Sequence, residues 1–577
     1  MPATAVAADA GDRRGVARPI KFGVWSPAAQ EYLRQWLTDA QARDQFVVRH
    51  HDTTAVFYNN KNEEPEPVYS RDHWTETYVQ WSPLGTYLTT FHRQGVALWG
   101  GQSWKKIVRL AHPGVRWIDY SPKETYCVTW SPEGEKNDDG EVLNLLVWDV
   151  RSGKVLRAFP TILPPSGHMT WPAFKWSHDE KYFARVVPDQ ISVYETPGMG
   201  LLEKKSIKIP GVQDFQWSPT DNILAYSTPE VGDVPARVTL MDIPSKTIRR
   251  TKNLFNVQDY RLHWHPDGDY FAVKVDRKGK RPFTSFELFR IREKDIPVES
   301  LELKDHVIAF AWEPKGDKFV LAHGEQPVPG TGPLPSNVSF YSMEAAKGRD
   351  AVVKHLKTLE RKPVNFLYWS PKGQFIVLAG LRGFNGQLEF WNTKEMEMMA
   401  SGEHFACTHV EWDPTGRYVT TSVSYMLYQL ETGYQIWSFT GKPLYKHQQD
   451  KFFMFLWRPR PPTLLSKEQV AKIKKNLKQY SAEFSKQDEY RENKALRAVI
   501  ERRRRLMDEW RAYREARTRD YEAVRGPLLT RWQRRWRWRR RRRLTRPAGL
   551  AWRRARAADA RGAETDHRRG GARARVG

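Results

Sequence analysis

The stretch WSPLGTYL at residues 81–88 decides the fold, because its pattern returns along most of the chain. An aromatic residue is followed by a polar residue, usually by Pro, and within a few positions by Gly or a charged residue and another aromatic. The instances begin at Trp81, Tyr120, Trp176, Trp217, Trp264, Trp312, Trp369, Trp412 and Trp457. Their spacings lie between 39 and 57 residues, which indicates a repeat architecture.

A second pattern lies between most neighbouring instances. It is an alternating run that ends in an aromatic residue and often continues with an acid or amide, as in LLVWD at Leu145, ISVYE at Ile191 and LEFWN at Leu388. Such alternation predicts strands, and the Pro-containing step predicts a tight turn between them. Four short strands per repeat predict a WD-type β-propeller blade. The alternative, a series of β-sandwiches with chance WSP tripeptides, does not explain nine near-regular recurrences.

The two ends of the repeat region predict how the ring closes. Residues 46–58, FVVRHHDTTAVFY, predict two strands before the first motif, and FFMFLW at Phe452 predicts a strand without a partner after the last. Pairing these ends would remove both open edges. We therefore predict an all-β fold over residues 20–462, a propeller of nine blades, with eight as the alternative.

The charge of the 577-residue chain is unevenly distributed. Residues 1–465 carry a net charge of +4, whereas residues 466–577 hold 36 Lys and Arg residues against 14 Asp and Glu residues, a net charge of +22. This excludes a uniformly basic nucleic-acid-binding domain and indicates a nearly neutral body with a basic C-terminal arm. Two cysteines exclude a disulfide framework and favour a reducing compartment, and no run of 18 apolar residues predicts a membrane span. We expect a cytoplasmic protein without a membrane partner.

The arm predicts a long amphipathic helix over residues 463–525. Ser466 is a candidate N-cap, with Gln469 returning the bond. An apolar stripe at helical spacing then predicts a partner-binding face, and it consists of Val470, Ile473, Leu477, Tyr480, Phe484, Leu506, Trp510 and Tyr513. The alternative for the first turns is ordinary packing against the propeller. Residues Arg502, Arg503, Arg504 and Arg505 predict either a solvated helix face or contacts with RNA phosphates.

The two ends of the chain predict disorder. Residues 1–19 form the N-terminal end, and residues 526–577 contain 18 Arg, no Lys and only three acids. The Arg/Trp bias of this tail is also expected of GC-rich DNA translated in another frame, so a gene-model artefact is the alternative to a real disordered tail.

The sequence carries no catalytic constellation. There is no G-x-S-x-G elbow, P-loop or G-x-G-x-x-G motif. His404, Cys407 and His409 have no fourth ligand nearby, so a structural turn is favoured over zinc. The acidic stretch from Glu133 to Glu141 predicts a solvated loop inserted in the second blade. We predict a non-enzymatic protein with no catalytic, cofactor-binding or metal site.

Long collinear segments resemble the b-type subunits of eukaryotic translation initiation factor 3, over about residues 19–525. They include RDHWTETYVQWSPLGTYLTTFHRQGVALWGG from Arg71, NLFNVQDYRLHW from Asn253, EWDPTGRYVTTSVS from Glu411 and LWRPRPPTLLSKEQVAKIKKNLKQYS from Leu456. The resemblance implies a nine-bladed propeller followed by a long helix, in a multisubunit complex on the small ribosomal subunit that supports mRNA recruitment and scanning. It also implies partners of the a, g and i types, with the i-type contact around Trp510 and Tyr513.

The sequence departs from this family at both ends. The family usually has an RNA-recognition-motif domain before the propeller, whereas about 20 residues precede Ile20 here and no matching motif occurs. Contacts of that domain with the a-type and j-type subunits are therefore in doubt. The family's C-terminus is typically acidic, unlike residues 526–577. The alternative function is that of a general RNA-binding propeller protein that uses its basic arm, with mRNA and ribosomal RNA as weak or indirect partners.

Overall fold

β-Strands dominate the part of the chain that the computed structural model describes. This part comprises residues 33–39, 41–60, 64–138, 140–162, 170–279, 283–325, 332–344, 352–463, 465–479, 481–482, 485–486 and 501–521. Within these residues the strands form nine antiparallel sheets, each of four strands except one of five. The prediction of nine blades is confirmed, and the alternative of eight is wrong.

We number the blades by the sequence motif at the end of each inner strand. Blade 1 contains β4 (Val79–Trp81), β5 (Leu88–His92), β6 (Gly95–Gly100) and β7 (Lys105–Leu110). Blade 2 contains β8 (Trp117–Tyr120), β9 (Tyr126–Lys136), β10 (Val142–Asp149) and β11 (Lys154–Pro160). Blade 3 contains β12 (Lys175–Trp176), β13 (Tyr182–Val187), β14 (Gln190–Glu195), β15 (Gly200–Leu201) and β16 (Ile207–Lys208).

The next three blades follow the same order along the chain. Blade 4 contains β17 (Asp214–Trp217), β18 (Ile223–Thr228), β19 (Ala236–Asp242) and β20 (Ile248–Leu254). Blade 5 contains β21 (Val257–Trp264), β22 (Tyr270–Arg277), β23 (Phe283–Arg290) and β24 (Val298–Leu303). Blade 6 contains β25 (His306–Trp312), β26 (Lys318–Gly324), β27 (Ser336–Ser342) and β28 (Lys354–Lys362).

The last three blades include the one that joins the two ends of the ring. Blade 7 contains β29 (Phe366–Trp369), β30 (Phe375–Gly380), β31 (Gln387–Asn392) and β32 (Glu397–Glu403). Blade 8 contains β33 (His409–Trp412), β34 (Tyr418–Val423), β35 (Gly433–Ser438) and β36 (Pro443–Gln448). Blade 9 contains β37 (Phe452–Trp457), β1 (Gln45–His50), β2 (Thr53–Tyr58) and β3 (Glu66–Asp72).

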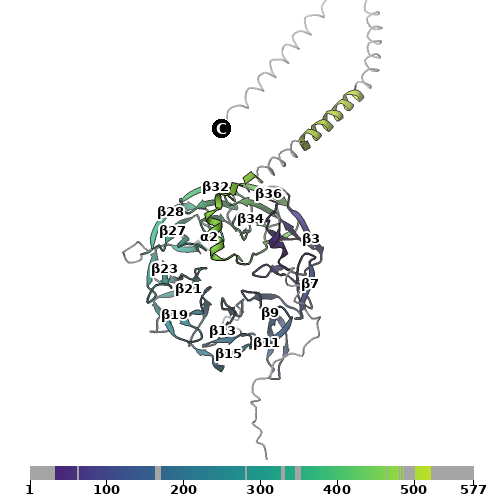
Figure 1. The fold of residues 1–577 in the computed structure, drawn as a ribbon. Coiled ribbons are helices and arrows are strands. Elements are labelled where there is room, and N and C mark those ends of the chain that lie inside the picture. Colours follow the sequence, from purple (N-terminus) through teal and green to yellow (C-terminus); the bar gives the residue numbers. More distant parts are fainter. Residues whose placement is uncertain are drawn as a thin grey trace, which may run out of the picture. The chain divides into compact units, whose positions relative to one another are not determined.

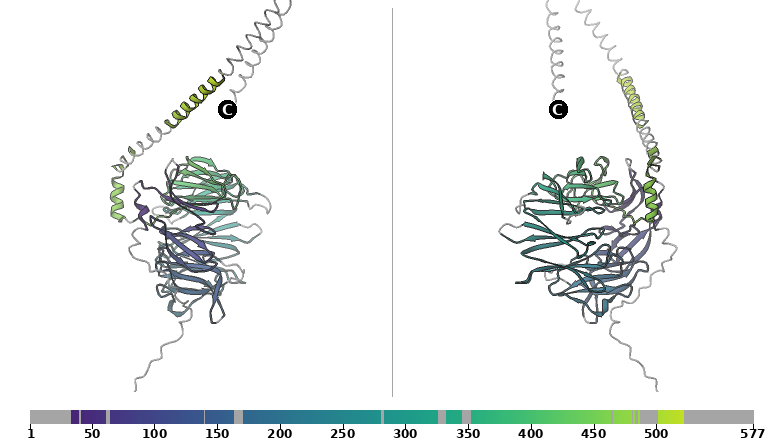
Figure 2. Two further views of the ribbon diagram at one scale, coloured as in Figure 1. Left: turned by 90° about the vertical axis from the view of Figure 1, so that its right-hand side faces the viewer. Right: turned by 60° about the vertical axis from the view of Figure 1, so that its left-hand side comes forward.

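The blades are arranged around a common axis, and the core lies between them (Figure 1). Figure 2 shows the same ring of sheets from the side. One buried cluster combines Leu240 of blade 4 with Phe271 and Val273 of blade 5. Another combines Val47 of blade 9 with Trp81 of blade 1. Because each sheet buries both faces against its neighbours, every blade depends on the next for its core.

Ring closure occurs where the sequence predicted it. Strand β37 pairs antiparallel with β1, so that Phe46 lies opposite Trp457 and Val48 opposite Phe455. The last strand of the chain thus becomes the inner strand of the sheet that the first strands begin. This pairing satisfies the backbone groups of β37 that would otherwise form an open edge.

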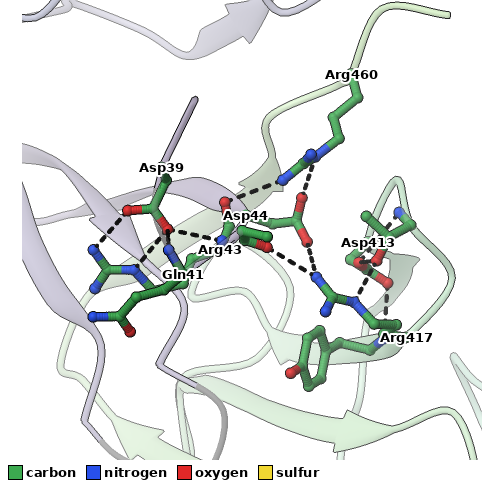
Figure 3. Close-up of polar contacts among 10 residues, drawn as sticks. Asp39, Gln41, Arg43, Asp44, Asp413, Arg417 and Arg460 are labelled. Carbon is green, nitrogen blue, oxygen red and sulfur yellow. Dashed lines mark hydrogen bonds and ion pairs between the residues drawn. The ribbon is translucent and has the colours of Figure 1, made fainter. Parts of the chain in front are cut away.

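A polar cluster holds the closing segments together (Figure 3). The Asp44 side chain is fully inaccessible to solvent and accepts hydrogen bonds from Arg460 Nε at 2.5 Å and Arg417 Nη2 at 3.4 Å. Burial and the nearby charge of Asp44 raise the pKa of Asp413 to about 6. The two guanidinium groups therefore offset the cost of burying carboxylates at this junction.

Arg458 joins the same closing segments through an aromatic cage. Its guanidinium carbon lies 4.3 Å from the ring centroid of Trp36, 4.9 Å from that of Trp81 and 5.4 Å from that of Trp104. Arg458 Nε donates to the carbonyl of Gly85 at 2.6 Å and Nη1 to Gln45 Oε1 at 2.7 Å. These contacts fix η1 (Gln35–Thr38), β1 and the first motif turn around one buried cation.

The WSP motif forms the turn after each inner strand. Ser82 Oγ accepts a hydrogen bond from the amide of Tyr87 at 2.9 Å, and Ser121 Oγ accepts one from the amide of Tyr126. Gly85 has a φ of +69°, and a Cβ there would lie 2.1 Å from the Pro459 carbonyl oxygen. At the equivalent position Glu124 has a φ of +63°, and its carboxylate accepts the Leu84 amide at 2.8 Å, so a charged residue links two turns there.

The motif indoles connect neighbouring blades. Trp412 Nε1 donates to the carbonyl of Tyr368 at 3.0 Å, which is the residue immediately before the motif Trp of blade 7. The same bond joins the following pairs: Trp81 to Leu456, Trp217 to Lys175, Trp312 to His263 and Trp369 to Ala311. In these five blades the motif Trp therefore supplies a hydrogen bond between blades as well as apolar area, whereas Nε1 of Trp176, Trp264 and Trp457 has no partner among the described residues.

The acidic stretch in blade 2 differs from its sequence prediction. The acidic stretch from Glu133 to Glu141 is not simply a loop, because β9 continues to Lys136 and pairs there with Val142 of β10. The expected loop over residues 133–136 is therefore wrong, since the hairpin ladder extends through them.

The chain divides into two compact units, Met1–Pro462 and Thr463–Gly577. Residues 1–32 and 522–577 lie outside the described residues, so the expected disorder of residues 1–19 and 526–577 remains a prediction.

The bond between blades gives a testable difference between two equally buried tryptophans. Trp412 and Trp176 are both 8% exposed, but Trp176 Nε1 has no hydrogen-bond partner among the described residues. We expect Trp412→Phe to lower the free energy of unfolding by about 1 kcal/mol more than Trp176→Phe, because only the first loses a hydrogen bond. Urea unfolding of both variants measures this difference. Equal destabilisation would show that the bond contributes nothing.

Candidate protein-interaction surfaces

The helix after the propeller starts at the predicted cap. Helix α2 (Lys467–Lys475) has Ser466 as its N-cap. Ser466 Oγ accepts the Gln469 amide at 3.1 Å, and Gln469 Oε1 accepts the Ser466 amide at 2.9 Å. The predicted capping box is confirmed. It satisfies two amide groups that a helix start leaves without intrahelical partners.

The first part of the predicted stripe faces solvent to an increasing degree along the chain. Val470 is half-buried, Ile473 is 36% exposed and Leu477 is 59% exposed. Helix α2 ends with Asn476 as its C-cap, and residues 477–479 are again helical. The side chains of Tyr480 and Phe484 lie outside the described residues. A single helix over residues 463–525 therefore remains a prediction.

The second part of the stripe lies on a described helix, residues 501–521. Three of its large side chains are strongly exposed: Leu506 at 58%, Trp510 at 54% and Tyr513 at 62%. The structure brings these three onto one side of the helix, because they are three or four positions apart. Large apolar side chains that lie exposed next to one another are typical of an interaction site.

Arginine side chains border this stripe. The guanidinium carbon of Arg514 lies 5.4 Å from the Trp510 ring centroid, and that of Arg517 lies 6.0 Å from the Tyr513 ring centroid. Arg502, Arg503, Arg504 and Arg505 are all exposed, and none forms an ion pair within the described part of the chain. Their arrangement is compatible with either predicted role, a solvated face or phosphate binding.

The candidate zinc residues have structural partners instead. His404 is 3% exposed, and its Nδ1 lies 2.7 Å from Thr421 Oγ1, which also accepts Trp437 Nε1 at 2.8 Å. Cys407 Sγ donates to the carbonyl of His409 at 3.3 Å. Among the described residues no group of three or more His, Cys, Asp or Glu side chains is placed to hold a metal. The interpretation of His404 as part of a structural turn accounts for this geometry.

Blade 2 contains the same arrangement. His112 Nδ1 lies 2.7 Å from Thr129 Oγ1, and Trp148 Nε1 donates to that oxygen at 2.7 Å. Burial lowers the pKa of both His112 and His404 to about 4. Both imidazoles are therefore neutral at pH 7, as a bond within the core requires.

One exposed apolar surface was not predicted from the sequence. The connection between β34 and β35 exposes Met426 at 76%, Leu427 at 52% and Leu430 at 72%. The base of this loop is held to β37, because the Tyr425 amide donates to the carbonyl of Phe452 at 2.6 Å. A run of apolar residues without alternation between two predicted strands is the signal that could have indicated it. Within the described residues, no helix is both long and apolar enough to cross a membrane.

Comparison with known proteins identifies close relatives. The chain is 48% identical over 494 residues to a Xenopus laevis protein named as the b subunit of eukaryotic translation initiation factor 3, covering 85% of this chain and 69% of the relative. Proteins of the same name in Mycosarcoma maydis and Schizosaccharomyces pombe are each 44% identical, covering 86% and 87% of this chain and 75% and 76% of those relatives. The family described as eukaryotic translation initiation factor eIF2A matches residues 252–455.

A solved structure supports the fold. It is described as the crystal structure of the eukaryotic initiation factor, and it superposes with a TM-score of 0.60 at 20% sequence identity. The match covers 73% of this chain and all of the other. At this identity the likeness shows the propeller fold and no more.

The buried histidines predict how stability depends on pH. A histidine whose pKa falls from 6.5 to about 4 on folding binds a proton more readily when unfolded. Stability is therefore fully present above pH 6.5 and is lost as pH falls toward 4, by about 3 kcal/mol per residue at most. We expect His112→Gln with His404→Gln to reduce this loss in urea unfolding measured from pH 7 to pH 4.5.

The matched comparison is with the unchanged chain. Burial raises the pKa of Asp119 to about 7 and that of Glu411 to about 8, so these carboxyls act in the opposite direction in the same pH range. They are common to both proteins, and the difference between the two pH profiles isolates the histidines. Parallel profiles would contradict the assignment of neutral, buried imidazoles.

Proposed function

Because the chain belongs to the family of the b subunit of eukaryotic translation initiation factor 3, we propose that it is a non-enzymatic scaffold component of that multisubunit factor. In this role it acts in the cytoplasm, docks on the small ribosomal subunit and holds other subunits through its C-terminal helix. The proposal includes support of mRNA recruitment and scanning. The propeller supplies rigid faces for these contacts, as repeat architectures with many solvent-exposed loops do.

The exposed stripe on residues 501–521 is the observation that carries this proposal. Leu506, Trp510 and Tyr513 place three large apolar side chains on one side of a helix that is otherwise rich in charged residues. Such a helix gains stability when the stripe is buried against a partner, in the way amphipathic helices bind apolar grooves. Trp and Tyr are also the residue types most often found at the centre of interfaces.

The proposed partner subunits are those that the family resemblance implies. We assign the stripe around Trp510 and Tyr513 to the i-type subunit, with the g-type subunit on the same helix. Val470, Ile473, Leu477, Tyr480 and Phe484 form the proximal half of the helix stripe in this proposal. Subunits of the a type complete the set, and Arg502 to Arg505 contact phosphates of RNA close to these subunits.

A double substitution tests the helix assignment. We expect Trp510→Ala with Tyr513→Ala to weaken the affinity for the i-type subunit at least about tenfold, because each removes a large side chain from the interface centre. Calorimetric titration of the full chain with the purified i-type subunit measures the affinity. The propeller's melting should not change, since both residues lie in the other compact unit.

The matched control is on the opposite side of the same helix. Glu515→Ala with Arg519→Ala removes two exposed side chains and leaves the net charge unchanged. We expect this control to keep the affinity. Removing residues 526–577 should also keep it, because that segment has no apolar period. If the tail deletion abolishes binding and the aromatic pair has no effect, the interface is assigned to the wrong part of the arm.

A general RNA-binding protein is the second candidate function. The net charge of +22 on residues 466–577 and the exposed run Arg502 to Arg505 favour it. Cross-linking the full chain in cell extract separates the two functions. A fixed set of subunits together with small-subunit RNA supports the scaffold, whereas scattered RNA without subunits supports the second candidate.

A further inference from the structure

The first blade of the propeller carries a local excess of positive charge. Residues 77–118 contain five Lys or Arg residues and no Asp or Glu. This stretch covers all four strands of blade 1, from β4 to β7. Because residues 1–465 carry a net charge of only +4, the net charge of +5 on this stretch is a local excess of cations.

Strand register brings two of these cations to one side of the blade. In the pairing of β6 with β7, Lys106 lies opposite Trp99 and Arg109 lies opposite Ala97. Trp99 and Ala97 are two positions apart and share a face of the strand, so Lys106 and Arg109 share that face too. Trp99 belongs to the cluster buried between blades 9 and 1, so both cations lie on the side of blade 1 that faces blade 9.

A third cation reaches the same place from blade 9. The guanidinium carbon of Arg71, on β3, lies 5.2 Å from the Trp99 ring centroid. Figure 1 shows that β3 and β7 are neighbouring outer strands of the ring. Arg71 thus lies over the Trp99 indole, while Lys106 and Arg109 lie on the same side of the neighbouring strand, opposite Trp99 and Ala97. We call these three residues the junction cations.

Burial and the positive charges of all three junction cations lower the pKa of His92. Burial is the largest cause of its lowered pKa, and the next cause is the positive charge of Arg109. Arg71 and Lys106 act in the same direction, while Glu76 opposes them. Since such effects fall off with distance, the junction cations lie close enough to one another to create a shared positive potential.

The junction cations form no ion pair within the part of the chain that the structure describes. Arg71 and Lys106 are exposed, Arg109 is half-buried, and none of the three forms an ion pair with another described residue. Some other cations of the ring are paired, as Lys252 is with Glu287 at 3.2 Å and Lys362 with Glu389 at 2.8 Å. Three neighbouring cations without an ion-pair partner among the described residues favour a polyanion at this place.

The surroundings favour RNA over an acidic protein. Among the described residues before Val142, no large hydrophobic side chain is exposed. A protein interface normally has an apolar core, whereas binding to a nucleic-acid backbone relies on Arg and Lys contacts with phosphates. Arg71 adds to this fit, because a guanidinium stacked on an indole keeps its N–H edge free for a phosphate.

We propose that Arg71, Lys106 and Arg109 form a binding site for the phosphate backbone of RNA at the junction of blades 9 and 1. This inference deepens the proposed function, and it rests on that function only in identifying the RNA as part of the small ribosomal subunit. The site reads no base sequence, because it consists of phosphate-binding groups. It fixes which side of the propeller rim lies against RNA.

The test compares two triple substitutions in the full chain. Arg71→Gln, Lys106→Gln and Arg109→Gln remove the junction cations. Lys205→Gln, Lys208→Gln and Arg250→Gln remove three exposed cations that form no ion pair among the described residues of blades 3 and 4. Both triples lower the net charge by the same amount, so the basic arm contributes equally to each. Thermal melting verifies that each variant is folded.

Two probes are used over a range of salt concentrations: a labelled 20-base-pair RNA duplex and purified small ribosomal subunits. We expect the junction triple to weaken binding to both by at least about fivefold. The slope of the logarithm of affinity against the logarithm of salt should become shallower by about 2.7, because about three phosphate contacts are lost and each contributes about 0.9 on a duplex. The control triple should change neither quantity measurably. Lys106→Gln with Arg109→Gln, which keeps the Arg71 stack, should give an intermediate slope.

Each contrary result has a distinct meaning. Equal losses of affinity in the two triple variants would overturn the proposed site, because the net charge alone would then determine binding. Loss of binding to ribosomal subunits with unchanged duplex binding would identify an acidic protein partner and also overturn it. If the junction triple binds ribosomal subunits as the unchanged chain does, the site is wrong while docking stands. If the unchanged chain does not bind them at all, the proposed function fails, and the duplex result alone decides the site.

Discussion

The pairing of β37 with β1 is the interaction on which the rest of the ring depends. Neither strand has another route to a complete hydrogen-bond ladder, because β1 begins the chain's sheet structure and β37 ends it. Two buried charged groups lie at this junction. One is the Asp44 carboxylate, which accepts hydrogen bonds from Arg417 and Arg460, and the other is the Arg458 guanidinium in its aromatic cage. Such groups are costly to bury and are stable only when all their partners are in place. They therefore specify one closure rather than simply adding stability.

The repeat motif has a physical explanation in the same terms. Each motif Trp lies at the end of an inner strand, and in five blades its indole donates to the preceding blade immediately before that blade's own motif aromatic. Blade 2 replaces the indole by Tyr120, whose hydroxyl lies 2.6 Å from Thr89 Oγ1 of blade 1. The contact between blades is preserved although its chemistry differs. This explains how a repeat with variable spacing and composition builds a regular ring.

The surfaces of the molecule divide by chemistry. The described helix at residues 501–521 presents aromatic side chains, the loop between β34 and β35 presents aliphatic ones, and the junction of blades 9 and 1 presents unpaired cations. Inside the ring, by contrast, histidines such as His404 and His112 are neutral and bonded to threonine hydroxyls. This distribution is what the proposed scaffold role predicts, with ionisable groups that are neutral in the interior and charged at the rim.

The sequence by itself determined the elements whose signal is local. Aromatic spacing predicted nine blades, alternating runs predicted the strands, and Ser466 with Gln469 predicted the start of α2, because each depends on residues a few positions apart. The ring closure could be predicted as well, since two unpaired ends leave one solution. The tertiary structure alone decided the rest. Arg71, Lys106 and Arg109 meet because two outer strands from different blades are neighbours, and Glu124 links two turns that are 40 positions apart. Such contacts depend on how blades stack, and no local pattern records that stacking.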